Sequence, residues 1–137
     1  MKKTIIIIIS VAVFLVIVFF GILMARNVSI ARRLKALPIS EVDLASVSDG
    51  LYKGDFAYGG FKYEVEVTVK EHKIEDIKVL KNRPTSHAKK AEGVIEKVLK
   101  NQSLKVDAVS GATNTSIALL KAIENALTDK PKILNSH

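Results

Sequence analysis

The segment from Thr4 to Ala25 most constrains how this chain folds, because it has no charged residue and consists mostly of Ile, Val, Leu and Phe. An α-helix rises about 1.5 Å per residue, so about 20 apolar residues cross the hydrocarbon core of a bilayer. A cleaved signal peptide fits less well, because its apolar region usually has about 7–15 residues and ends at small residues. We therefore predict a transmembrane helix over residues 4–25, preceded by a basic N-terminus at residues 1–3.

The basic character of the chain is concentrated at the two ends of this helix. The formal net charge is +7, and six cations account for nearly all of it: Lys2, Lys3, Arg26, Arg32, Arg33 and Lys35. From residue 36 onward, 15 Lys and Arg face 14 Asp and Glu, so the rest of the chain is close to neutral. Nucleic-acid binding needs a basic face on the domain itself. We expect no nucleic-acid partner, and we assign the cations to contact with anionic lipid head groups.

Residues 26–46 form a basic stem and linker, in which Pro38 ends the helix that continues beyond the bilayer. The clearest strand follows at 61–69, where apolar and polar residues alternate from Phe61 to Val69. Further strands are expected at 51–58 and 74–79. Gly59-Gly60 and the short connection at 71–73 join the three strands. The pattern predicts an antiparallel meander.

Two helices are expected after the strands. Ser86 is a suitable N-cap for a helix from about 87 to 101, and a last helix follows Gly111. Each carries one apolar stripe with helical spacing, made of Ala91, Val94, Ile95, Val98 and Leu99 in the first and of Ile117, Leu120, Ile123, Ala126 and Leu127 in the second. The predicted fold class is α+β, a small antiparallel sheet with two packed helices, preceded by one transmembrane helix and followed by a tail at 130–137.

The run from Val106 to Ser116 has the pattern of a strand end, a tight turn and a helix start. A helix start presents free N–H groups and the positive end of the helix dipole, which favour a phosphate. Gly111 permits a sharp turn, and Asp107 can accept N–H donors or help to hold a cation. Four hydroxyl residues gather here: Ser110, Thr113, Thr115 and Ser116. A helix cap rich in Ser and Thr, with no ligand, explains the same residues.

Asp107-Ala108-Val109-Ser110-Gly111-Ala112-Thr113 resembles the flavinylation motif of the FMN-binding domain family, in which Asp, two variable residues, Ser or Thr, Gly, Ala and Thr follow one another. The similarity to the flavin-bearing subunits of sodium-pumping NADH:quinone oxidoreductases extends over about residues 47–128. It includes the opening at 49–54 and the strand pair at 61–79. The stretch at 81–87 departs from the His-Asn-Glu-Thr-Pro-Gly-like sequence of many members and is closer to a shorter, single-domain branch.

The resemblance implies an FMN-binding domain at 47–129, with FMN held by a phosphoester to the hydroxyl of Thr113. A separate magnesium-dependent flavin transferase would install it from FAD. Asp107 and Ser110 would recognise or position the group, and the binding segment would be completed by Gly111, Ala112, Thr115 and Ser116. The domain would not be an enzyme in its own right. It would relay electrons between membrane electron carriers or other redox proteins.

The same resemblance places the domain outside the cytoplasmic membrane, although a positive-inside count weakly favours a cytoplasmic C-terminus. Two other functions stay open: a binding or regulatory module without flavin, and a reductase that binds FMN non-covalently. We expect no metal site, because the chain has no Cys and because His72, His87 and His137 lack metal-ligand spacing. Tyr52, Tyr58 and Tyr63 fit core packing better than contact with a flavin ring.

Overall fold

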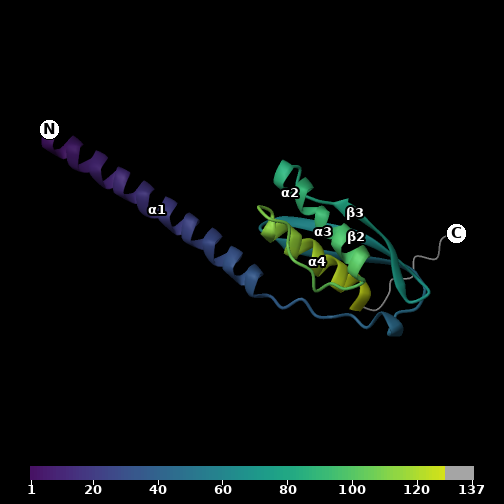
Figure 1. The fold of residues 1–137 in the computed structure, drawn as a ribbon. Helices are drawn as coiled ribbons and strands as arrows, with labels where there is room; N and C mark the ends of the chain where they lie inside the picture. The colour runs from purple at the N-terminus through teal and green to yellow at the C-terminus, as the bar shows by residue number, and fades with distance from the viewer. Residues whose placement is uncertain (129–137) are drawn as a thin grey trace. The chain divides into compact units, whose positions relative to one another are not determined.

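The computed structural model describes residues 1–128, apart from the side chains of Asn27, Ile30 and Ala31. The tail expected at 130–137, with His137, lies outside the described residues, as does Asp129. The chain divides into two compact units, Met1–Arg33 and a second unit that begins at Leu34. Figure 1 shows the fold and the order of its elements.

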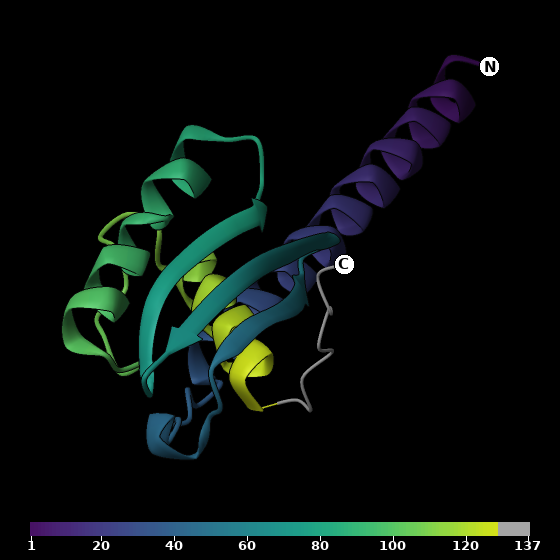
Figure 2. The ribbon, with the colours of Figure 1, turned by 90° about the vertical axis from the view of Figure 1, so that its right-hand side faces the viewer.

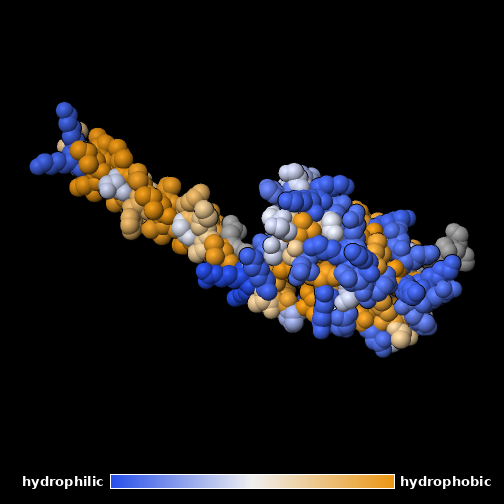
Figure 3. Space-filling view, in the orientation of Figure 1, coloured by the Kyte–Doolittle hydropathy of each residue, from blue (hydrophilic) through white to orange (hydrophobic). Residues whose placement is uncertain are grey.

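The first unit lies within helix α1 (Lys2–Ala36), which ends two residues before Pro38. Its segment Lys2–Arg26 is long and apolar enough to cross a membrane. Figure 3 shows hydrophobic side chains covering this helix, with hydrophilic ones at its N-terminal end. Large hydrophobic residues such as Ile8, Phe14 and Phe19 are more than half exposed. So long an apolar surface needs a bilayer or a partner to cover it.

The second unit is built on the three-stranded antiparallel sheet β1 (Gly50–Tyr58), β2 (Phe61–Lys70) and β3 (Lys73–Lys81), in the order β1-β2-β3. This confirms the predicted meander. Gly59 and Gly60 both have positive φ, 58° and 78°, as the two central residues of a type I′ hairpin turn require. Phe61, expected on the buried face, is 44% exposed because it lies at the open end of the sheet beside this turn.

Irregular pairing between β2 and β3 decides which residues of β3 face the core. Thr68 pairs with Asp76 and Val69 with Ile74, so Glu75 is an extra residue on β3. An extra residue of this kind is a β-bulge, and it shifts the alternation by one. Ile74 and Ile77, three residues apart, are consequently buried on the same face.

Helix α4 (Thr113–Thr128) lies across the buried face of β1 and β2, as Figure 2 shows. Strand β1 and helix α4 come so close at Gly54 that a Cβ atom there would lie 2.1 Å from the carbonyl oxygen of Ala122. The core lies between the sheet and the helices, and it includes residues of all three strands, of α4 and of the helices between 86 and 101. On the other face, the pKa of Lys62 is raised by its hydrogen bond with Glu64 and by the nearby charge of Asp55.

The helix predicted for about 87–101 is divided into α2 (Ser86–Ala91) and α3 (Gly93–Asn101). The break falls at Glu92, where bonds between residues three apart replace the α-helical ones. The predicted Ser86 cap is wrong. Thr85 caps α2, and its hydroxyl accepts a hydrogen bond from the amide of Ala88 at 3.1 Å.

The expected linker is partly packed on the second unit. Ile39, Val42 and Leu44 lie against the core, and η1 (Leu44–Ser46) is one turn of 3-10 helix. The amide of Ser40 donates to Glu124 at 3.2 Å. These contacts fix the segment that leads into β1.

Candidate functional site

The motif segment forms a turn that leads directly into α4. The amide of Ala112 donates to the carbonyl of Val109 at 2.9 Å, and Gly111 has φ 78° at the third position of this turn. Positive φ at that position is the signature of a type II turn, and it favours glycine. The carbonyl of Ala112 then accepts the first bond of α4 from Ser116, at 3.0 Å.

Ser116 holds this turn from inside. Its side chain is fully buried, and its hydroxyl donates to the carbonyl of Ala112 at 2.8 Å while accepting from the amide of Val109 at 3.1 Å. A hydroxyl has one donor and two acceptor positions, so its only proton is used inside the protein. Ser116 therefore positions the turn and is withdrawn from its surface.

The first turn of α4 presents the groups that suit a phosphate. The first amides of a helix have no partner within it, and in residues 1–128 those of Thr113, Asn114 and Thr115 have none elsewhere. Thr113 is partly exposed, and its hydroxyl makes no hydrogen bond within the same range. A nucleophilic oxygen and unpaired amides thus share one helix end.

The segment before the turn runs along α2 and α3, in the opposite direction to them. The carbonyl of Asp107 accepts from Lys97 Nζ at 3.0 Å, and a Cβ atom at Gly93 would lie 3.5 Å from Val109. This segment was predicted to be a strand end, and that prediction is wrong. It lies beside helices, where no strand backbone is available to pair with it.

Lys90 is the third residue of the α2–α3 pair that comes close to this segment, after Lys97 and Gly93. A Cβ atom at Gly111 would lie 3.8 Å from Lys90 Nζ, and apart from Gly111 and its two neighbours in the chain no other described residue comes within 4 Å of that point. Gly93 and Lys97 are four residues apart on one side of α3, and Lys90 lies on α2, before the break at Glu92. The lysine was absent from the site residues expected from the sequence, since it lies 17 positions before the first residue of the motif, Asp107.

The expected site residues differ in how exposed they are. Ser110 and Gly111 are exposed in the turn, Ala112 is buried beneath it, and Thr115 is partly exposed on α4. Asp107 is exposed on the preceding segment, and within residues 1–128 its only side-chain partner is Lys97, which donates to its backbone carbonyl.

Asn114 is a second residue that the sequence prediction missed. Its Oδ1 atom is buried and has no hydrogen-bond partner in the described part of the chain. Buried polar atoms in folded proteins nearly always have a partner. Its position directly after Thr113 is the one signal in the sequence that could have indicated it.

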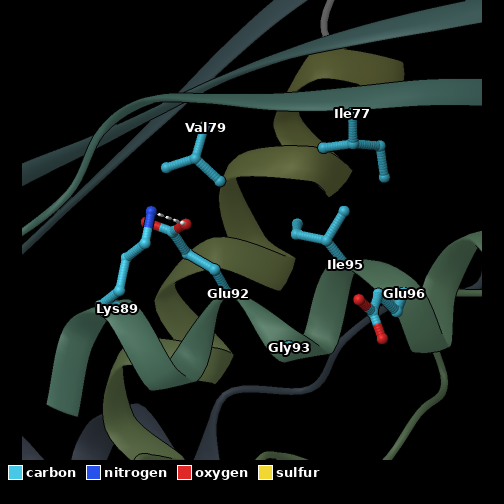
Figure 4. A pocket seen from close by; sticks show the side chains of 7 residues that line it. All are labelled: Ile77, Val79, Lys89, Glu92, Gly93, Ile95 and Glu96. Atoms are coloured by element: carbon cyan, nitrogen blue, oxygen red, sulfur yellow. Dashed lines mark ion pairs between the residues drawn. The ribbon is translucent and has the colours of Figure 1, made fainter. Parts of the chain in front are cut away.

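A separate hollow of about 410 Å³ lies between β3 and the α2–α3 pair, lined by Ile77, Val79, Lys89, Glu92, Gly93, Ile95 and Glu96. Figure 4 shows Ile77 and Val79 pointing from the strand towards the helices, with Ile77 opposite Ile95. At one side of the hollow, Lys89 Nζ lies 3.2 Å from Glu92 Oε2. Successive helical residues point about 100° apart, so Lys89 and Lys90 serve different sides of α2.

The stretch that departs from the family pattern is held by contacts of its own. Asn82 donates to the carbonyl of Ala88 at 2.9 Å and to Glu92 Oε1 at 3.0 Å. Arg83 lies 4.3 Å from the ring centre of Phe61 and donates to the carbonyl of Gly59 at 3.1 Å. The connection to α2 is thereby tied to the β1–β2 hairpin.

In residues 1–128, none of the hydrogen bonds that hold the turn involves the other residues considered in the sequence. His72 Nδ1 lies 3.2 Å from the carbonyl oxygen of Val47, and His87 is exposed. Within residues 1–128, no group of three or more His, Asp or Glu side chains is arranged to hold a metal ion. Tyr52 and Tyr63 are core residues, and Tyr58 is partly buried against the core.

The fold and the site define a small α+β domain with a helix start suited to a phosphate-bearing ligand. A family model described as the FMN-binding domain matches residues 58–128, more than half of the chain. The chain therefore belongs to the FMN-binding domain family, and the match supports FMN as its ligand. No match is found among curated proteins.

Proposed function

We propose that this protein is a membrane-anchored electron-transfer flavoprotein that carries FMN through a phosphoester to Thr113. The observation that carries the proposal is Thr113, the first residue of α4, which is partly exposed and whose hydroxyl makes no hydrogen bond in the described structure. It belongs to the segment matched by the family model.

The residues present fit the phosphate end of FMN. The unpaired amides of the first turn can donate to phosphate oxygens. The space over Gly111 is open except for the ammonium group of Lys90. The buried Oδ1 of Asn114 lacks a donor that a ligand hydroxyl could supply. Near Thr113 the protein therefore has, within residues 1–128, amides without acceptors, a side-chain oxygen without a donor, and open space beside Gly111.

The attachment is a phosphoryl-group transfer from FAD, catalysed by a separate flavin transferase with magnesium. A bond forms between the Thr113 oxygen and the phosphorus on the FMN side of FAD. The pyrophosphate P–O bond breaks, AMP leaves, and the hydroxyl proton passes to a base of the transferase. The redox state does not change in this step.

Once bound, FMN supplies one- and two-electron redox chemistry, and the ester leaves its ring system free for it. The contribution of the chain is to hold the group by its phosphate at a rigid helix end. The candidate membrane helix would tether the domain to the bilayer, where membrane carriers or other redox proteins exchange electrons. We place the domain on the outer face of the cytoplasmic membrane, and we regard the domain as a relay whose own chemistry is limited to electron transfer.

The experiment is to express the full chain with and without an active flavin transferase, denature it in acid and examine the gel for flavin fluorescence. We expect a fluorescent band that disappears in Thr113→Ala and persists in Thr115→Ala, the matched control two residues along. Absence of fluorescence from cells with a working transferase rejects the covalent link. If flavin then co-purifies with the native protein, the non-covalent reductase is favoured; if none does, the binding module is.

The side of the membrane is tested separately. A protease added to intact cells or to sealed spheroplasts should digest the domain while a cytoplasmic marker stays whole. Protection of the domain until the membrane is permeabilised would place it in the cytoplasm and reject this part of the proposal.

A further inference from the structure

We infer that Lys90 is a binding residue for the phosphodiester of the loaded protein and neutralises its negative charge. The inference rests on the proposed function and extends it to a residue outside the motif. It starts from the approach of Lys90 Nζ to Gly111, where a Cβ atom would lie 3.8 Å from the ammonium nitrogen.

Packing between the segment 107–111 and the helices brings Lys90 beside the turn. The segment 107–111 is held against α2 and α3 at two further points, by Lys97 on the carbonyl of Asp107 and by Val109 on Gly93. Ser116 fixes the turn from the other side. Because these contacts hold the turn beside α2 and α3, the exposed side chain of Lys90 is within reach of the turn.

Within residues 1–128, the positive charge of Lys90 has no ion-pair partner. The preceding Lys89 pairs with Glu92 at 3.2 Å, and the other ion pairs of that range involve Lys53, Lys62 and Lys121. Lys90 makes neither an ion pair nor a hydrogen bond there. A cation kept beside a turn and a helix N-terminus, with no carboxylate assigned to it, is complementary to an anion.

The chemistry of the ester fits a lysine at this distance. A phosphodiester has one negative charge shared by two oxygens that are not esterified, and it stays ionised at neutral pH. The first-turn amides of α4 can bind one of these oxygens, and Lys90 can reach the other from the side of Gly111.

The test compares the wild type with Lys90→Gln, Lys90→Arg and Lys89→Gln, all as full chains in detergent micelles with purified transferase, FAD and Mg²⁺. Two quantities are measured: the initial rate of flavin attachment, and the ³¹P resonance of each loaded protein. Lys89→Gln is the matched control, because it removes the same charge from the adjacent position on another side of α2.

In Lys90→Gln we expect attachment to slow by about two- to fivefold, the size of effect typical of a contact between exposed charges. We also expect a displaced ³¹P resonance, and a difference in rate that shrinks as salt is added. Lys90→Arg, which keeps the charge, should restore both quantities, and Lys89→Gln should match the wild type. Complete loss of attachment in Lys90→Gln with normal attachment in Lys90→Arg would also support the inference.

Several results would overturn it. Wild-type rate and resonance in Lys90→Gln would show that the lysine makes no contact with the ester. A slower rate with an unchanged resonance would restrict Lys90 to the reaction with FAD and transferase. If Lys90→Gln and Lys90→Arg slow attachment equally, the shape of the lysine side chain matters and its positive charge does not. If the wild type itself is never loaded, the proposed function fails and this inference falls with it.

Discussion

The amide of Val109 donates a hydrogen bond to the buried hydroxyl of Ser116, seven residues further along and 3.1 Å away. The same hydroxyl donates to Ala112 at 2.8 Å. One side chain of α4 thus closes the turn that carries Ser110 and Gly111. In the sequence, Ser116 cannot be told apart from the other hydroxyl residues near the motif. In the structure, it fixes the conformation of the turn that precedes Thr113.

Replacing Ser116 by Ala should destabilise the domain by about 1–3 kcal/mol, because the amide of Val109 loses its acceptor in a partly buried place. Urea unfolding followed by tyrosine fluorescence measures this. The control is Thr115→Ala, whose hydroxyl makes no hydrogen bond in the described structure and whose effect should stay within about 0.5 kcal/mol. Equal effects of the two variants would contradict the role assigned to Ser116.

Gly111→Ala should weaken the turn, because an L-residue at φ 78° costs about 1–2 kcal/mol. Gly111→Asn should be milder, since asparagine tolerates positive φ better than alanine does. Unfolding midpoints of the two variants provide the measurement. If alanine and asparagine cost the same, conformation at Gly111 is not what limits substitution there.

Gly54→Ala should be among the most damaging single changes in the sheet. Its Cβ would stand 2.1 Å from the carbonyl oxygen of Ala122 and 2.4 Å from the amide of Ala126, both backbone atoms of α4. Overpacking of this kind costs about 1–3 kcal/mol or more, and α4 would have to move. Gly50→Ala on the same strand is the control, because its nearest atom is 3.7 Å away. Similar unfolding curves for the two variants would refute the close approach.

Glu124→Ala should cost about 3 kcal/mol, since it leaves the ammonium group of Lys121 without its partner at 2.9 Å. Both side chains are largely buried, 11% and 14% exposed. The amide of Ser40 loses an acceptor as well. Glu66→Ala, which breaks the looser pair with Lys53 at 3.7 Å, should cost about 0–1 kcal/mol in the same urea titration. A ranking in the opposite order would mean that the buried pair does not stabilise the fold.

Local patterns determined much of this protein. The alternation along Phe61–Val69 required a strand with one buried face, and Gly59-Gly60 required a tight turn, because both properties depend only on neighbouring residues. The uncharged run at 4–25 likewise required a long helix. The motif at 107–113 indicated FMN through family resemblance, and the family match at 58–128 agrees with it.

Contacts between distant segments decided the rest. The bulge at Glu75 depends on pairing with β2, and the break at Glu92 falls where α2 gives way to α3. The segment before Ser110 is no strand, because it lies along helices. Lys90 reaches Gly111 only because that segment runs antiparallel to α2 and α3. The sequence by itself determined the motif and its Thr113, and the tertiary structure decided that Lys90 lies beside Gly111, since that depends on packing between segments that are far apart in the chain.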